Sequence, residues 1–137
     1  MIEMIDFATL ERSSPQNSYL VCPPGIGRAV PDRVAPVFEM SPARLRELWF
    51  RIVSREGRIT MVAWIDDTLE CEFIERSLVF KFPRRITVQF LPEGQGRATL
   101  AVYSRSIFGA MDLGVNRRRI ERWLTQLGKE AAVAAPK

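Results

Sequence analysis

The sequence contains no histidine, only two cysteines and only three lysines in 137 residues. The absence of histidine excludes Ser-His-Asp and Cys-His nucleophilic catalysis, HExxH zinc sites and every metal site that needs an imidazole ligand. Cys22 and Cys71 are far apart and have no CxxC spacing, so the sequence predicts neither a zinc site nor a thioredoxin-like motif. We therefore expect no metal, no cofactor and no catalytic residue, and we favour a protein that is not an enzyme.

Long apolar runs are also absent, because no stretch of about 18 residues is apolar enough for a transmembrane helix. The first six residues include two acids, Glu3 and Asp6, where a signal peptide would be basic. We expect a cytoplasmic protein. In such a reducing compartment Cys22 and Cys71 are expected to remain free thiols.

The composition is that of an ordinary soluble domain, with 47% hydrophobic and 26% charged residues. The length predicts one domain over residues 1–137. The formal charge is +4, and the basic residues are 17 Arg and 3 Lys, which resembles the codon bias of a GC-rich genome. A nucleic-acid interface would need basic and aromatic residues on one exposed face, so nucleic acid is the less favoured partner.

Residues 1–40 are predicted to form an extended, proline-rich arm. Five prolines and two glycines between Ser13 and Pro36 disfavour a regular helix or a central strand there. The arm also contains apolar residues, so we expect it to lie over an edge of the folded core. The core is predicted to span residues 41–128 and to be followed by a tail at 129–137.

Two amphipathic helices are predicted within this core. Ser41-Pro42 is a typical helix start, an apolar stripe follows at spacings of three and four, and Gly57 is a typical stop, which predicts a helix over 42–56. A second stripe predicts a helix from about Asn116 to Gly128. Its apolar residues are Ile120, Trp123, Leu124 and Leu127.

Between the helices the apolar period changes to two, which predicts four to five short strands. Alternation covers 59–65 and 69–73 around an Asp66-Asp67 turn, then 78–82, 86–90 and 98–102, with a hairpin loop at 93–96. Strands without intervening helices form an antiparallel sheet. The predicted fold class is α+β: a two-layer structure in which both helices pack on one face of the sheet, with a curved START-like grip as the alternative.

The C-terminal part of the sequence contains a specific motif. It consists of Tyr103-Ser104-Arg105-Ser106, then Gly109, the run Asp112-Leu113-Gly114-Val115-Asn116-Arg117, and Arg119. The motif resembles the signature of the DUF1499 family of uncharacterised proteins. Softer similarity extends over 7–10, 34–38, 76–77 and 82–83, and the chain departs from the family at 84–85, where relatives tend to have an acid and this chain has two arginines. The resemblance implies the location of a motif and no reaction.

The same motif supplies the candidate site. Arg117, Arg118 and Arg119 lie in the first turn of the second predicted helix, where the helix dipole is already positive and cations are unfavourable. Such a placement favours a binding site for an anion. The candidate anion- or partner-binding residues are Arg105, Asp112, Gly114, Asn116, Arg117 and Arg119, with Arg118 facing solvent.

Alternatives to this interpretation remain open. Asp112, Glu121 or the turn at 66–67 could pair with these arginines in a structural salt network. The five acids between Asp66 and Glu75 have no regular ligand spacing, and alternation places Glu70 and Glu72 on a solvated face. Trp64 is a candidate for contact with a partner.

The sequence favours a non-catalytic binding or accessory protein that engages an anionic group on a small ligand or a protein partner. A small-molecule-binding protein or an enzyme with a cavity between sheet and helices is the first alternative, and a nucleic-acid-binding module is the second. The ligand, the pathway and the oligomeric state are not encoded in any pattern of the sequence.

Overall fold

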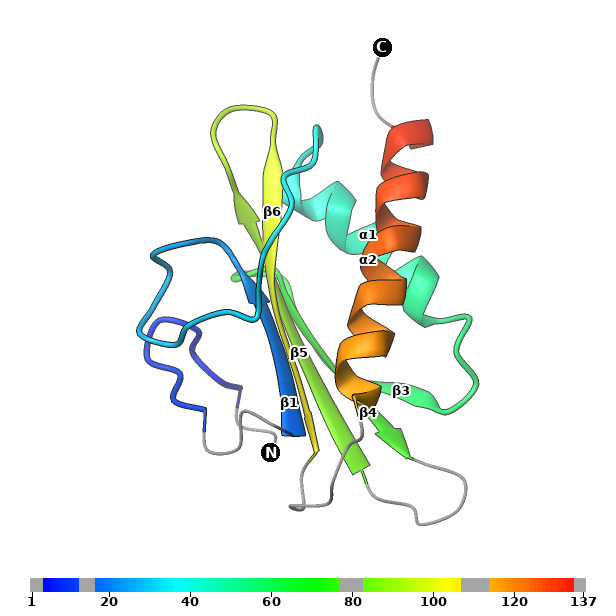
Figure 1. Ribbon diagram of the computed structural model, residues 1–137. Helices are drawn as coiled ribbons and strands as arrows, with labels where there is room; N and C mark the ends of the chain where they lie inside the picture. The colour runs from blue at the N-terminus through cyan, green and yellow to red at the C-terminus, as the bar shows by residue number, and fades with distance from the viewer. Residues whose placement is uncertain (1–3, 13–16, 77–82, 107–113, 135–137) are drawn as a thin grey trace.

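The computed structural model describes residues 4–12, 17–76, 83–106 and 114–134. Six strands form one sheet in the order β2-β1-β6-β5-β4-β3, with every neighbouring pair antiparallel except β1 and β2 (Figure 1). The strands are β1 (Ser18–Cys22), β2 (Arg33–Val34), β3 (Ile59–Ile65), β4 (Glu70–Arg76), β5 (Pro83–Pro92) and β6 (Ala98–Ser106). This architecture confirms the predicted α+β class and its antiparallel sheet.

The two hairpins follow from local sequence. Asp66-Asp67 turns the chain between β3 and β4, and Leu69 completes that turn with a φ of 55°. Between β5 and β6, Gly94 and Gly96 have φ values of 74°, which a side chain would disfavour. The predicted strand at 78–82 lies outside the described residues.

Both helices cover one face of the sheet (Figure 1). Helix α1 (Pro42–Val53) begins at Ser41, whose hydroxyl accepts a hydrogen bond from the amide of Arg44 at 3.2 Å. The two helices meet at Trp49 and Trp123, whose rings pack edge to face with centroids 5.6 Å apart. The predicted apolar stripe of the second helix is confirmed, because Ile120, Trp123 and Leu127 are at most 1% exposed.

Both predicted helix ends were wrong by a few residues. Helix α1 ends at Val53, before the predicted end at residue 56. Helix α2 (Val115–Ala134) continues through Gly128 and two more turns, into the segment predicted as a tail. The continuation is stabilised because Ala131 is buried in the core beside the sheet, so packing outweighs the low helix propensity of one glycine.

The proline-rich arm differs most from the prediction. Residues 18–22, which were predicted to lie in an extended arm, form β1, a fully buried strand between β2 and β6. Tyr19 and Glu121 join this strand to α2, because the Tyr19 hydroxyl donates to the Glu121 carboxylate. The prolines bracket a five-residue strand, and the sheet therefore has more strands than predicted.

Two stretches of the arm, residues 5–10 and 26–29, cover the sheet face that is opposite the helices (Figure 1), while Ala35, Phe38 and Met40 pack in the core on the helix side. Phe7 and Leu10 pack there on Leu20 and Tyr103. Gly27 makes this covering possible, because a Cβ at residue 27 would lie 2.3 Å from the carbonyl oxygen of Phe7. Strands β1 and β6 are therefore buried on both faces, between the helices and the N-terminal segment.

Candidate functional site

The motif arginines do not gather in one place. Arg105 lies on the face of β6 that the N-terminal segment covers, with its guanidinium 4.9 Å from the ring of Tyr103. Arg119 lies on α2, which packs on the other face. The expected convergence of Arg105 with the helix arginines therefore does not occur, since the sheet separates them.

Arg105 belongs to a buried cluster centred on Glu72. The Glu72 carboxylate accepts from Arg85 at 2.5 Å and from the Thr87 hydroxyl at 2.6 Å, and it lies 3.6 Å from Arg105. Glu72 is 0% exposed, so the prediction that it lies on a solvated face was wrong. The alternation of apolar residues correctly places Glu72 on the sheet face opposite the helices, but the N-terminal segment covers that face and excludes solvent from it. Burial lowers the pKa of Arg105, although Glu72 acts against this shift.

A second cluster lies on the helix side and is centred on Glu75. Glu75 forms ion pairs with Arg119 of α2 and with Arg84 of β5, the latter at 3.3 Å. The side chains of both arginines are nearly buried, with 12% and 13% exposed respectively. Arg84 and Arg85 are adjacent and project to opposite faces, so this one arginine pair serves both clusters.

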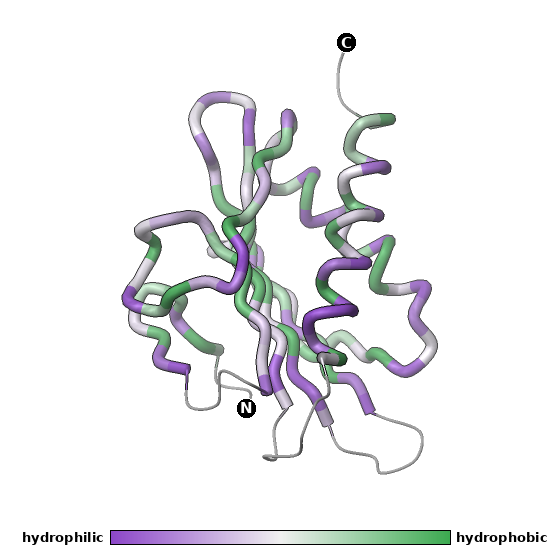
Figure 2. Tube along the Cα trace, in the orientation of Figure 1, coloured by the Kyte–Doolittle hydropathy of each residue, from purple (hydrophilic) through white to green (hydrophobic). Residues whose placement is uncertain are grey.

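Of the remaining motif residues, some are buried between α2 and the sheet and others are exposed to solvent. Asn116 is buried and accepts a hydrogen bond from the Ser104 hydroxyl at 2.7 Å, so it joins α2 to β6. Gly114 has a φ of 79°, and its carbonyl accepts from the amide of Arg118. Arg117 and Arg118 are both exposed, and Asp112 lies outside the described residues. Figure 2 shows that the first turns of α2 are hydrophilic.

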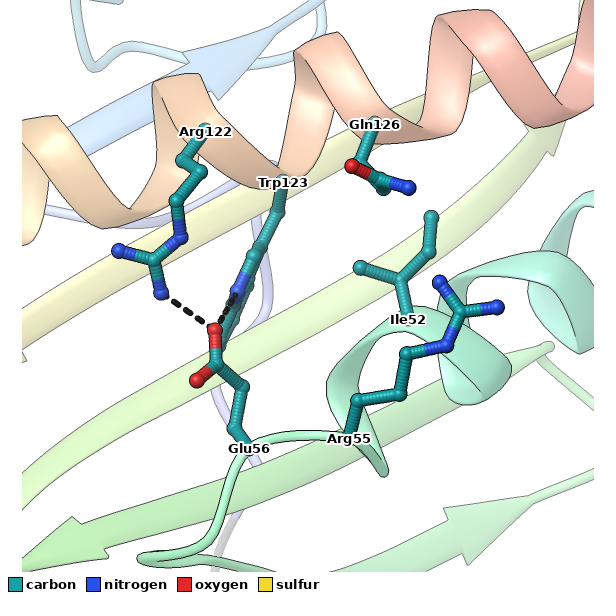
Figure 3. A pocket seen from close by; sticks show the side chains of 6 residues that line it. All are labelled: Ile52, Arg55, Glu56, Arg122, Trp123 and Gln126. Atoms are coloured by element: carbon teal, nitrogen blue, oxygen red, sulfur yellow. Dashed lines mark hydrogen bonds and ion pairs between the residues drawn. The ribbon is translucent and has the colours of Figure 1, made fainter.

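Two cavities open along the side of α2 that faces the loop after α1, and Arg119 lines one of them. A cavity of about 390 Å³ is lined by Glu56, Gly57, Arg58, Ile59, Glu75 and Arg119. A smaller cavity of about 260 Å³ is lined by Ile52, Arg55, Glu56, Arg122, Trp123 and Gln126 (Figure 3). Glu56 lines both cavities. We call the two together the α2 groove.

Glu56 organises the α2 groove. Its carboxylate accepts hydrogen bonds from Arg122 and from the Trp123 indole nitrogen, the latter at 2.8 Å (Figure 3). Partial burial acts to raise the pKa of Glu56, but the hydrogen bonds from Trp123 and Arg122 outweigh it, so the pKa lies below its usual value. Glu56 is therefore a fixed negative charge at neutral pH.

Arg119 has hydrogen-bonding capacity left over. Within the described part of the chain, its Nε and Nη1 atoms are buried and have no hydrogen-bond partner, while Nη2 pairs with Glu75. Burial lowers the pKa of Arg119, and Glu75 opposes this shift. Buried donors are normally satisfied, so donors next to a cavity are suited to a bound oxygen ligand.

Comparison with known proteins gives one match. The model of a family described as proteins of unknown function, DUF1499, matches residues 25–127. The chain belongs to the DUF1499 family. No curated protein and no solved structure matches this DUF1499 protein.

Several residues of the α2 groove were missed by sequence reasoning on this DUF1499 chain. Glu56, Arg58 and Glu75 are distant in sequence from the motif and reach Arg119 only through the sheet and the loop after α1. Two of the expected acidic partners are engaged elsewhere, since Glu121 pairs with Arg33 and Asp66 with Arg46, and Asp112 lies outside the described residues. Within the described residues no group of three potential metal ligands occurs, and no helix is long and apolar enough to cross a membrane.

Proposed function

We propose that this DUF1499 protein is a non-catalytic binding protein whose α2 groove takes a small molecule through a phosphate or carboxylate group. The observation that carries the proposal is the pair of unpartnered donors on Arg119, beside the cavity that this residue lines. A guanidinium donates charge-assisted N–H bonds to phosphate and carboxylate oxygens, and Nε and Nη1 of Arg119 can each donate one such bond.

Charge and volume support an anionic ligand. The α2 groove is lined by four arginines and two glutamates, so its lining is net positive. The larger cavity, about 390 Å³, falls within the range of roughly 300 to 1,000 Å³ that small-molecule sites occupy. Arg58 is exposed at its rim and has the reach to contribute a second cation.

A small ligand is favoured over an extended nucleic acid because the guanidinium donors lie in a recess instead of on a flat basic face. Arg117 is exposed on the first turn of α2, outside the α2 groove, and is available to an acidic protein partner. We further propose a cytoplasmic location, which the two free buried cysteines support.

The experiment is thermal unfolding of the wild type and of Arg119→Gln, each with and without inorganic phosphate. A ligand that binds only the folded state at about ten times its Kd stabilises that state by about 1.4 kcal/mol, which raises the melting temperature by roughly 5 °C. We expect this rise in the wild type and its loss in Arg119→Gln.

Arg118→Gln is the matched control, because Arg118 is the adjacent helix residue, carries the same charge and is exposed. It should retain the full phosphate effect. Equal loss in both variants would mean that phosphate responds to general charge, and no phosphate effect in the wild type would contradict the proposal.

A further inference from the structure

The outer edge of β3 differs from the rest of the sheet. β3 is the last strand of the sheet, and no described segment pairs with its free edge. Its seven residues, ITMVAWI, include no charged residue and no proline. Exposed apolar edges of this length are sites where another strand adds, and natural proteins usually protect them with charges or prolines.

An exposed apolar surface adjoins this edge. Phe50, Met61 and Trp64 are 39%, 39% and 37% exposed. The rings of Phe50 and Trp64 pack edge to face at 5.6 Å. We call these three residues the β3 patch.

The β3 patch is held rigid before any partner binds. The Arg46 guanidinium lies 4.0 Å from the centre of the Trp64 ring. Arg46 is itself fixed by the carbonyl of Ile65 at 3.0 Å and by Asp66 at 2.7 Å. A fixed aromatic side chain loses little conformational entropy on binding, which favours association.

We propose that β3 pairs antiparallel with β3 of a second copy of this chain, so that two sheets join into one across a two-fold axis. The argument for a second copy is the charge at the two ends of the strand. Arg58 precedes β3, and Asp66-Asp67 follow it. Antiparallel self-pairing brings the basic end of each copy to the acidic end of the other.

The β-bulge in β3 selects one register. A register shift between Met61 and Ala63 removes Val62 from the alternation, so Met61 and Trp64 lie on the same face, opposite Phe73 and Cys71 of β4. In this register Ala63 of one copy pairs with Ala63 of the other on the two-fold axis, and the helix-covered faces of both sheets lie on the same side. Because Val62 is outside the alternation, the next residues on either side of Ala63 are Met61 and Trp64. Met61 therefore lies opposite Trp64 of the second copy, which is a favourable contact between sulfur and an aromatic ring.

The same register brings Arg58, in the turn before β3, near Asp67 of the second copy, in the turn after β3, twice in each dimer. Arg58 and Asp67 are exposed, and within the described residues neither is in an ion pair. The opposite edge of the sheet offers no equivalent surface, because β2 has two residues and one of them is Arg33. The inference does not depend on the function proposed for the α2 groove.

Sedimentation equilibrium of the full chain, from low to high micromolar concentration, tests the dimer. We expect wild-type protein to self-associate in this range. Arg58→Glu alone and Asp67→Lys alone should each weaken association by about tenfold or more, because each homodimer then contains two like-charge contacts. Circular dichroism melts verify that both variants are folded.

Mixing the two variants gives the decisive result. In the mixed dimer, one copy carries Arg58→Glu and the other carries Asp67→Lys. Residue 58 of each copy then faces a residue 67 of opposite charge, so the mixture should associate as well as wild type does. Arg118→Glu, which changes the charge equally on an exposed part of α2, should leave association unchanged. A wild type that stays monomeric at high micromolar concentration, or a mixture no tighter than the separate variants, would overturn the proposal.

Discussion

The Glu72 cluster and the Glu75 cluster are two versions of one arrangement on opposite faces of the same strand. Each places a buried glutamate between arginines from other elements, and Arg84 and Arg85 supply one arginine to each. The Glu72 cluster is closed, since the hydroxyl of Thr87 and two arginines surround a carboxylate that is 0% exposed. Glu75 itself lines the cavity beside Arg119, whereas the cavity next to the Glu72 cluster is lined by Arg85 and by residues of the N-terminal segment. The difference is that the Glu72 carboxylate is enclosed, while Glu75 reaches the cavity in which we propose that a ligand binds.

Glu72→Gln should give the largest effect. The substitution leaves Arg105, whose side chain is 15% exposed, without its compensating charge. Loss of one partner of a buried ion pair costs about 3 to 5 kcal/mol, so we expect a loss of about 3 kcal/mol in the free energy of unfolding. Urea denaturation measures it. Glu93→Gln, at an exposed position in the β5–β6 loop, is the control and should change stability little.

Glu75→Gln should cost less, about 1 kcal/mol, because the Glu75 side chain is 10% exposed and lines a cavity, so water can replace part of its interaction with the arginines. The same urea titration measures it. Equal losses for Glu72→Gln and Glu75→Gln would contradict the distinction between a closed and an open cluster.

The N-terminal segment covers the sheet face that is opposite the helices, and this explains which elements were predicted from the sequence and which were missed. Helix α1, the β3–β4 hairpin and the glycine loop before β6 depend on local patterns, and the sequence predicts them well. The strand at Ser18–Cys22 was missed because prolines surround it, and its stability comes from pairing with β6, more than 80 residues away.

The burial of Glu72 was missed for a related reason. Alternation assigns a residue to one of two faces, but it does not reveal whether a later or earlier segment covers that face. The α2 groove shows the same limit, because the motif pointed to Arg119 but not to Glu56 or Glu75, which join it only through tertiary structure.

The pH dependence of stability tests the role of Glu56 in the α2 groove. The pKa of Glu56 is lower in the folded state than its ordinary value of about 4.5. Its stabilisation is therefore present above about pH 4.5 and is lost as the pH falls through the lower, folded-state pKa. Glu56→Gln should reduce stability at neutral pH and flatten the dependence of stability on pH in this acidic range, as measured by urea denaturation at several pH values.

The reactivities of the two cysteines report on the two layers that cover the sheet, the helices and the N-terminal segment, and here we expect the smallest difference. Cys71 lies under the helices, where burial raises its pKa to about 12, and Cys22 lies under the N-terminal segment, where burial also raises the pKa. Both thiols should react slowly in the folded protein. Cys22 should react first, because local opening of an irregular segment costs less than removal of a helix layer.

Thiol labelling followed by peptide mass measurement gives both rates, and unfolded protein provides the rate of the unprotected thiols. Faster labelling of Cys71 than of Cys22 would show that the helix layer is the less stable covering.

The pairing of β1 with β6 has a consequence for synthesis of the chain. Leu20 lies opposite Tyr103, so the first strand to leave the ribosome has only the two-residue β2 as a partner until nearly the whole domain has been made. At about 5 to 20 residues per second, the roughly 80 intervening residues delay pairing by about 4 to 16 seconds. During that interval the apolar segment Ser18–Cys22 is exposed in the nascent chain. A chaperone that holds this segment would protect it from non-native contacts until β6 has been made.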